Sequence, residues 1–204
     1  MRHPPKHRYA DPAPLAIFCF GTTVLLLSLI NVHARGVTHA NVVIGLGFFM
    51  GGLGQMIGGI FEFILGNTFS MVTFIAFGGI WATLGIVLSP WSGIEEAYKD
   101  PKEFNQALGL MFMSWFAFVV CLTIASIRTF VGYFIALFLA GLTLLLLGCG
   151  HMVNNPGLLK AGGWAGLVCA GASYYCAAAA LFREVGLVKL PNRSLIYNRT
   201  PPES

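Results

Sequence analysis

Long runs of apolar residues, separated by short polar stretches, dominate the pattern of this chain. Each run has about the 20 residues that a helix needs to cross ~30 Å of hydrocarbon. Charged residues, prolines and Gly/Asn turn residues bound the runs. The pattern therefore predicts six transmembrane helices, at Pro14–Asn31, Ala40–Leu65, Phe69–Ser89, Gln106–Ser126, Phe130–Val153 and Ala161–Phe182.

Two other interpretations of these runs fit the sequence less well. Strands of a membrane barrel alternate polar and apolar residues, whereas these runs are continuously apolar, and backbone groups in lipid must pair within a helix. The first run follows a basic stretch, as in a signal peptide. However, Asp11, Pro12 and Pro14 interrupt the join, and no small-residue cleavage site ends the run before Asn31. We therefore predict an all-α membrane protein that retains its first helix.

Composition agrees with a chain solvated mostly by lipid. Of the 204 residues, 56% are hydrophobic and 10% are charged, against roughly 25% charged in an average soluble domain. A water-soluble fold could not cover its surface with so few charges. Six crossings and short loops use most of the chain, so we divide it into a tail (1–13), a six-helix membrane domain (14–183) and a second tail (184–204).

Basic residues predict which way the chain crosses the membrane, because cytoplasmic loops carry an excess of Lys and Arg. If both termini are cytoplasmic, the inner side holds eight of these residues: Arg2, Lys6, Arg8, Arg128, Arg183, Lys189, Arg193 and Arg199. The outer side then holds four: Arg35, Lys99, Lys102 and Lys160. Basic tails of this kind lie near anionic lipid headgroups, so the net charge of +4 does not call for a nucleic-acid partner.

Cysteines and histidines give no sign of a cofactor or a metal. No CxxC pair occurs, the cysteines have no histidine at ligand spacing, and His33, His39 and His151 do not cluster. All five cysteines fall within or at the ends of apolar runs, where a free thiol behaves as a small apolar residue. We therefore expect neither a metal nor a cofactor. The five are Cys19, Cys121, Cys149, Cys169 and Cys176.

Glycines recur at helical spacing in the second run. Steps of four, three and four place Gly47, Gly51, Gly54 and Gly58 on one helix face. Small side chains let two helices approach closely, so the stripe indicates tight packing within one subunit, packing between subunits, or a smooth pore wall. The sixth run repeats the spacing with Gly162, Gly166, Ala170, Ser173 and Ala177.

Polar residues inside membrane helices are costly and mark helix contacts or a solute path. Gln55 and Glu62 stand seven residues apart, two turns along one face of the second helix and beside the glycine stripe. Glu62 is the only charged residue inside a predicted span. Its carboxylate can reach the interface or pair with Arg128, or it can bind and release a proton during transport. The sequence leaves these alternatives open.

Several short motifs resemble those of a known family. Asp11-Pro12-Ala13-Pro14-Leu15-Ala resembles the Asn-Pro-Ala-Pro-Leu-Gly signature of the acetate uptake transporters, or succinate-acetate permeases, of bacteria, archaea and fungi. Asp11 replaces the usual asparagine, and Ser28 stands where a helical asparagine is common. The similarity continues to Phe182, in order, through Phe20-Gly-Thr-Thr, Gly51-Gly-x-x-Gln55, Glu62-x-x-x-Gly-Asn-Thr-Phe69, Phe77-Gly-x-x-Trp81, Gly162-Gly-Trp-x-Gly166 and Tyr175.

The resemblance implies a homo-hexamer of six-helix subunits, each with its own pore for acetate or another small carboxylate such as succinate. It places an apolar constriction at Phe20 and Phe77, with a third member at or beside Phe138. A carboxylate also needs hydrogen-bond donors along its path. The candidate donors are Thr22, Thr23, Gln55, Asn67, Thr68 and Tyr175.

The start of the first helix also has a local explanation. Pro12 and Pro14 begin a helix without leaving amide donors unpaired, and Asp11 can accept a hydrogen bond from the first turn. At a pore mouth, an unpaired Asp11 would repel an anion.

Three classes of function fit a membrane protein of this size. The sequence contains no nucleophile with its base and no metal cluster of the kind that a membrane enzyme would need, so we do not expect an enzyme. We expect a carboxylate transporter or channel in a cell membrane, with proton coupling left open. The alternative is a non-transporting signalling or assembly protein of the same fold.

Overall fold

The computed structural model describes residues 9–191, and every regular element in that range is a helix. Six of its helices are long and apolar enough to cross a membrane, which confirms the predicted all-α fold with six transmembrane helices. Five are single helices: α1 (Ala13–Asn31), α4 (Thr68–Leu88), α6 (Pro101–Ser126), α7 (Val131–Met152) and α8 (Pro156–Glu184). Most of the two predicted tails lies outside the described residues.

The second crossing, residues 43–64, consists of three consecutive helical segments. These are α2 (Val43–Leu46), the π-helix η2 (Gly47–Gly54) and α3 (Gln55–Ile64). Widened helical turns of this kind are rare and often occur at functional sites. Short helices occupy the loops between crossings: η1 (Ala34–Gly36), η3 (Pro90–Ser92) and α5 (Ile94–Ala97).

Two helices begin five residues earlier than their apolar runs. An oxygen of Asp100 accepts a hydrogen bond from the amide of Lys102 (2.8 Å), and Pro101 opens α6. Asn155 likewise caps α8 through the amide of Gly157 (2.8 Å), followed by Pro156. Capping groups and a proline at the first position stabilise a helix start whatever the polarity of the first turn. The apolar pattern alone therefore placed both starts too late.

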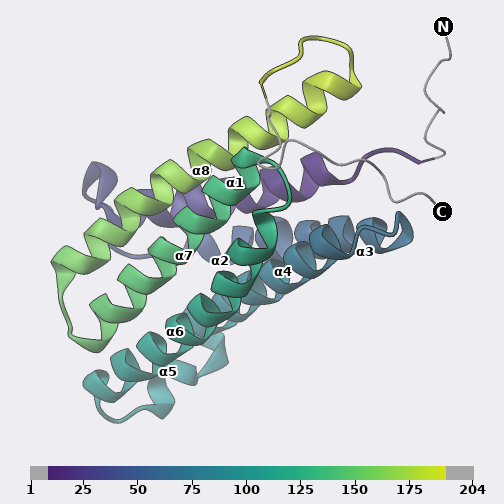
Figure 1. Ribbon diagram of the computed structural model, residues 1–204. Helices are drawn as coiled ribbons and strands as arrows, with labels where there is room; N and C mark the ends of the chain where they lie inside the picture. Colours follow the sequence, from purple (N-terminus) through teal and green to yellow (C-terminus); the bar gives the residue numbers. More distant parts are fainter. Residues whose placement is uncertain (1–8, 192–204) are drawn as a thin grey trace, which may run out of the picture.

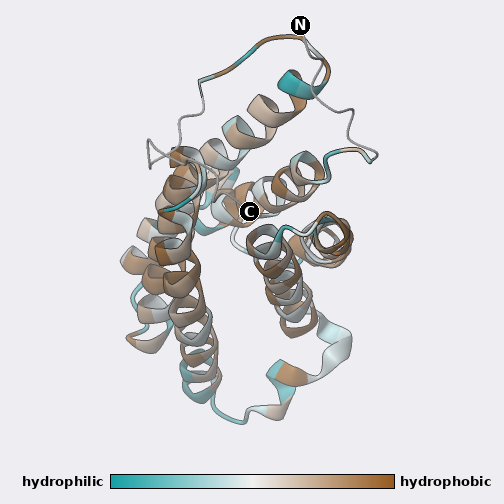
Figure 2. Ribbon diagram, turned by 45° about the vertical axis from the view of Figure 1, so that its right-hand side comes forward, coloured by the Kyte–Doolittle hydropathy of each residue, from teal (hydrophilic) through white to brown (hydrophobic). Residues whose placement is uncertain are grey.

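The long helices pack side by side, with hydrophobic residues along their lengths and hydrophilic residues at the loops (Figure 2). The start of α1 and the end of α8 lie at the same end of the bundle (Figure 1), where Asp11 forms an ion pair with Arg183. The described parts of the two predicted tails therefore lie at the same end of the bundle.

The glycine stripe of the second crossing packs against α1 and α4 of the same chain. A Cβ atom at Gly54 would lie 2.6 Å from Sγ of Cys19, and one at Gly58 would lie 2.7 Å from Cβ of Ala16. Both distances are too short for real contacts. The stripe is therefore a packing surface within the subunit, and it brings η2 and α3 against the face of α1 that leads to Phe20.

Candidate functional site

A cavity of about 860 Å³ opens at the end of the bundle where α1 begins and α8 ends. We call it the vestibule. The residues that line it come from every long helix or from the segments next to it. Its polar and charged lining residues are Tyr9, Asp11, Glu62, Asn67, Ser70, Arg128, Thr129, Tyr133, Arg183, Glu184 and Lys189.

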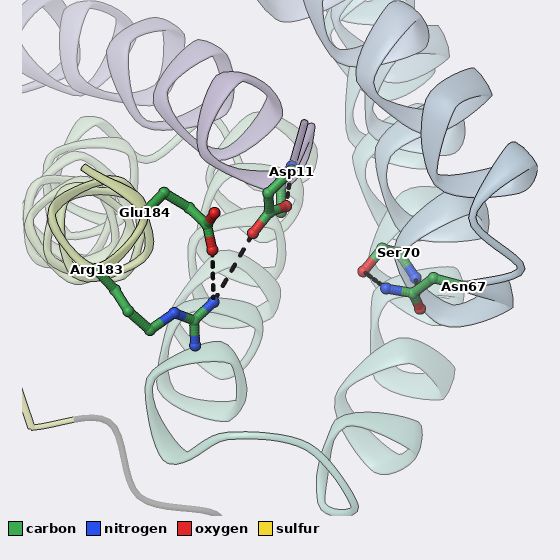
Figure 3. A network of polar contacts seen from close by, with 6 residues as sticks. Asp11, Asn67, Ser70, Arg183 and Glu184 are labelled. Atoms are coloured by element: carbon green, nitrogen blue, oxygen red, sulfur yellow. Dashed lines mark hydrogen bonds and ion pairs between the residues drawn. The ribbon is translucent and has the colours of Figure 1, made fainter. Parts of the chain in front are cut away.

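Acidic and basic side chains are paired at the mouth of the vestibule (Figure 3). Arg183 lies 3.9 Å from a carboxylate oxygen of Asp11 and 3.8 Å from one of Glu184. The other oxygen of Asp11 accepts a hydrogen bond from the amide of Ala13 (2.9 Å), which confirms that Asp11 accepts from the first turn of α1. Since Arg183 offsets its charge, Asp11 repels an anion less than an isolated carboxylate would.

Glu62 and Asn67 line the vestibule from the turn between α3 and α4. Gly66 has a φ of +73°, a conformation that favours glycine, and it lets the amide of Asn67 donate to the carbonyl of Glu62 (2.9 Å). The Asn67 side chain then caps α4, because its oxygen accepts from the amide of Ser70 and its Nδ2 donates to the Ser70 hydroxyl (2.9 Å, Figure 3). Glu62 is only 3% exposed, so the turn holds a buried carboxyl at the inner edge of the vestibule.

A second cavity, of about 40 Å³, lies deeper in the bundle. We call it the middle cavity. Tyr133 and Cys176 line both this cavity and the vestibule, so the two spaces adjoin. Among its lining residues, Gln55 is 1% exposed, and its Oε1 atom has no hydrogen-bond partner among the described residues. The remaining lining residues are Ile17, Phe20, Thr73, Phe74, Phe77, Ala136, Leu137 and Ser173.

A third cavity, also of about 40 Å³, follows on the side away from the vestibule and extends to Asn31, the last residue of α1. We call it the far cavity. Phe20 and Phe77 line both the middle and the far cavity. Their rings meet edge to face, with centroids 4.9 Å apart and planes at 70°, so this aromatic pair separates the two spaces. The three cavities thus follow one another along α1.

Several predicted site residues lie away from these cavities. The hydroxyl of Thr22 forms a hydrogen bond with that of Tyr174 on α8 (2.7 Å), and Thr23 donates within α1 to the carbonyl of Cys19. Tyr175 is 42% exposed and donates to the carbonyl of Pro191. Thr68, which opens α4, is exposed, as is Leu15 of the signature motif. Among these contacts, the one between Thr22 and Tyr174 joins α1 to α8.

Phe138 also lies outside the cavities. Its ring stacks on that of Phe134 on the outer face of α7 and is 54% exposed. Its neighbour Leu137 is buried and lines the middle cavity beside Phe20 and Phe77. The third position that the family resemblance places at or beside Phe138 therefore coincides with a cavity-lining side chain only at Leu137.

Sequence reasoning missed several lining residues, although a signal for some was present. Thr73 and Trp81 stand four residues before and after Phe77, which places all three on one face of α4, and each lines a cavity. Tyr133 and Cys176, between the vestibule and the middle cavity, carry no comparable signal, because only the packing of α7 against α8 brings them together.

The arrangement suits the passage of a small solute. Gln55 can donate or accept hydrogen bonds, the rings of Phe20 and Phe77 form an apolar surface between the middle and far cavities, and the charged vestibule lies before both. Among residues 9–191, no three His, Cys, Asp or Glu side chains stand close enough to hold a metal ion.

Comparison with known proteins identifies the family. The model of the GPR1/FUN34/yaaH family matches residues 1–195. The chain is 41% identical over 172 residues to accumulation of dyads protein 2 of Saccharomyces cerevisiae, a match that covers 84% of this chain and 61% of that protein's length. It is 31% identical over 183 residues to the succinate-acetate/proton symporter SatP of Escherichia coli K12, covering 87% of this chain and 91% of the symporter.

A solved structure shares the whole fold. The bacterial acetate channel SatP superposes with a TM-score of 0.80 at 30% sequence identity, over 90% of this chain and 99% of that one. Together with the six spans, this similarity makes the chain a multi-pass membrane protein. Since the family model matches nearly the whole sequence, the chain belongs to the GPR1/FUN34/yaaH family.

Proposed function

We propose that this protein carries acetate, or another small carboxylate such as succinate, across a cell membrane. The observation that carries the proposal is the series of three cavities, which runs from a charged vestibule through the core to the far end of α1 and is interrupted by one aromatic pair. The names of the symporter and the channel described above support the same substrate class.

In this proposal each space has its own task. The vestibule admits the anion, because Arg128, Arg183 and Lys189 line it together with the acidic groups. The amide of Gln55 then binds the carboxylate in the middle cavity. Phe20, Phe77 and Leu137 form the constriction, through which a methyl group passes more readily than a second carboxylate because the latter must lose its water.

Glu62 is the group that would couple transport to protons. It is a buried carboxyl that lines the vestibule, and the other ionisable groups that line the vestibule include Asp11, Arg128, Tyr133 and Arg183. A carboxyl in this position can take up a proton with the substrate and release it on the other side. Transport that ignores a pH gradient would instead identify a channel.

Orientation and assembly complete the proposal. We place the vestibule and both termini in the cytoplasm, in accord with the eight-to-four distribution of basic residues. A cysteine introduced at Gly93 should react with an impermeant reagent added outside intact cells, and one at Ser194 should not. The reverse pattern would overturn this orientation. Native mass spectrometry of the purified protein tests the homo-hexamer.

Uptake of radiolabelled acetate by liposomes tests the proposed function. Liposomes that contain the purified protein should take up acetate faster than empty liposomes, and unlabelled succinate should compete. The variant Gln55→Leu, similar in size but unable to bind the carboxylate, should lower uptake while the protein stays folded. Uptake no faster than in empty liposomes, from folded protein, would favour the non-transporting alternative.

A further inference from the structure

The chain turns back along α8 where that helix ends. Gly186 has a φ of +72°, a conformation that favours glycine, and the amide of Leu187 donates to the carbonyl of Phe182 (2.9 Å). This arrangement reverses the chain after a helix. Residues 187–191, which form neither helix nor strand, then run back over the last turns of α8 (Figure 1). We call them the strap.

One side chain holds the end of the strap. The hydroxyl of Tyr175, on α8, donates to the carbonyl of Pro191 (2.6 Å). Tyr175 precedes Glu184, the last residue of α8, by nine residues, or about 13 Å of helix, which the five residues of an extended strap can cover. Within residues 9–191, the strap forms no other hydrogen bond beyond Leu187, so loss of this hydroxyl would release its end.

The position of the strap agrees with the limits on backbone structure in a membrane. Irregular backbone occurs at membrane depth only where protein buries it or where it lines a water-filled cavity. Lys189 and Leu190 line the vestibule, which is wide enough to hold water. Since proline has no amide hydrogen, the hydroxyl of Tyr175 satisfies the only polar backbone group of Pro191.

The strap brings a positive charge into the vestibule. Without Lys189 the acidic residues of the described lining outnumber the basic ones, and the vestibule attracts anions less. The backbone of the strap carries this ammonium group, so its position depends on where the strap is held. The described lining contains three acidic residues (Asp11, Glu62, Glu184) and three basic residues (Arg128, Arg183, Lys189).

We propose that Tyr175 is a positioning residue for transport, which pins the strap so that Lys189 attracts the anionic substrate into the vestibule. The proposal deepens the proposed function and rests on it. Tyr175 lines none of the three cavities, so it acts through Lys189 and not by contact with the substrate.

The first test measures how firmly the strap is held. Trypsin cleaves after lysine, so the rate of cleavage between Lys189 and Leu190, followed by mass spectrometry, reports release of the strap. Tyr175→Phe removes only the hydroxyl and should raise this rate roughly fivefold, the factor by which one hydrogen bond shifts an equilibrium. Tyr98→Phe, at the opposite end of the bundle, is the matched control. Equal rates in the parent and in folded Tyr175→Phe would overturn the proposal.

A double-mutant cycle tests whether Tyr175 acts through Lys189. In vesicles of known orientation at low salt, the acetate concentration for half-maximal transport from the vestibule side should rise about twofold in Lys189→Gln. It should rise equally in Tyr175→Phe, and the double variant should show the same twofold rise, because both changes remove one charge from one place. The maximal rate should change less, since attraction acts on entry.

Two outcomes of the cycle would overturn the proposal. If the effects of the two substitutions multiply, Tyr175 acts independently of Lys189. If Tyr175→Phe makes transport of dilute acetate faster, the strap obstructs the vestibule and does not help to attract the anion.

A further test measures the attraction without transport. Ala180→Cys places a thiol in the lining of the vestibule, where an anionic and a cationic methanethiosulfonate reagent compete under the influence of the local charge. At low salt the ratio of the anionic to the cationic rate should fall roughly fourfold on adding Lys189→Gln or Tyr175→Phe, since the reagents differ by two charges. An unchanged ratio would overturn the proposal. The expected fall in protein that does not transport acetate would keep the pinned lysine and reject the proposed function.

Discussion

The vestibule and the two small cavities differ in size and chemistry, although α1, α4, α7 and α8 line all three. The vestibule has a volume of about 860 Å³ and contains charges of both signs, whereas each inner cavity has about 40 Å³ and no charged lining residue. A wide charged space attracts anions with little discrimination, whereas a narrow apolar one separates them by size and hydration. Under the proposed function, the comparison assigns attraction of the anion to the vestibule and its selection to the two small cavities, at different depths of the bundle.

The difference follows from helix geometry. The vestibule lies at helix ends and turns, where Asp11, Asn67 and Arg183 serve as caps or interface charges and remain in contact with water. Most residues that line the small cavities lie at mid-helix, where glycines let the helices approach closely and a charge would be costly.

The largest effect should come from forcing the narrow region apart. Gly54→Leu places a side chain where Cys19 of α1 already lies, and overpacking of this kind typically costs ~1 to 3 kcal/mol. We expect a lower melting temperature in detergent and loss of acetate uptake. Gly79→Leu is the matched control, because no atom lies within 4 Å of a Cβ at Gly79. Equal melting temperatures for both variants would contradict the packing described here.

The sequence predicted the fold in more detail than the site. Apolar runs located the six crossings, and the step of the glycines located the face that contacts α1. The sequence does not predict which faces of the different helices contact one another. Thr22 meets Tyr174 across 152 residues of sequence, and no local pattern encodes that contact. Consecutive helical residues also point about 100° apart, so an uncertainty of one residue in α7 separates exposed Phe138 from Leu137 in the cavity.

The second largest effect should come from widening the proposed constriction, which should change the ratio of succinate to acetate uptake. In Phe77→Ala the rate of succinate uptake relative to acetate should rise roughly tenfold, since size-based discrimination of this kind is worth ~1 to 3 kcal/mol. Phe77→Leu is the milder variant, because core Phe→Ala changes can cost ~3 to 5 kcal/mol of stability. Phe138→Ala removes an aromatic ring outside the cavities and should keep the parental ratio. If folded variants of Phe77 keep the parental ratio of succinate to acetate uptake, the constriction must lie at other residues.

A variant of Glu62 tests whether transport through the vestibule is coupled to protons. In the parent, an acidic exterior should accelerate the initial rate of acetate uptake several-fold beyond that of empty liposomes. Glu62→Gln keeps the shape of the side chain but cannot ionise, so this acceleration should disappear while uptake at equal pH persists. Glu103→Gln, at the opposite end of the bundle, should behave like the parent. A folded Glu62→Gln variant that still responds to the gradient would place proton coupling at another group.

The smallest effect should come from the charges at the mouth. Arg183 lies within 4 Å of Asp11 and Glu184, but its side chain is 57% exposed, and exposed ion pairs contribute only ~0.2 to 1 kcal/mol. Arg183→Gln should therefore leave the melting temperature nearly unchanged. Removing this cation should slow transport of dilute acetate from the vestibule side about twofold at low salt, because charge steers anions to the mouth. Since the Debye length falls to ≈ 8 Å at 0.15 M salt, the difference from the parent should shrink as salt is added.

Lys160→Gln, at the far end of the bundle, is the control for Arg183→Gln, measured in vesicles of known orientation. A defect that is equally large at high salt would mean that Arg183 binds the substrate directly, and attraction and selection would then share the vestibule.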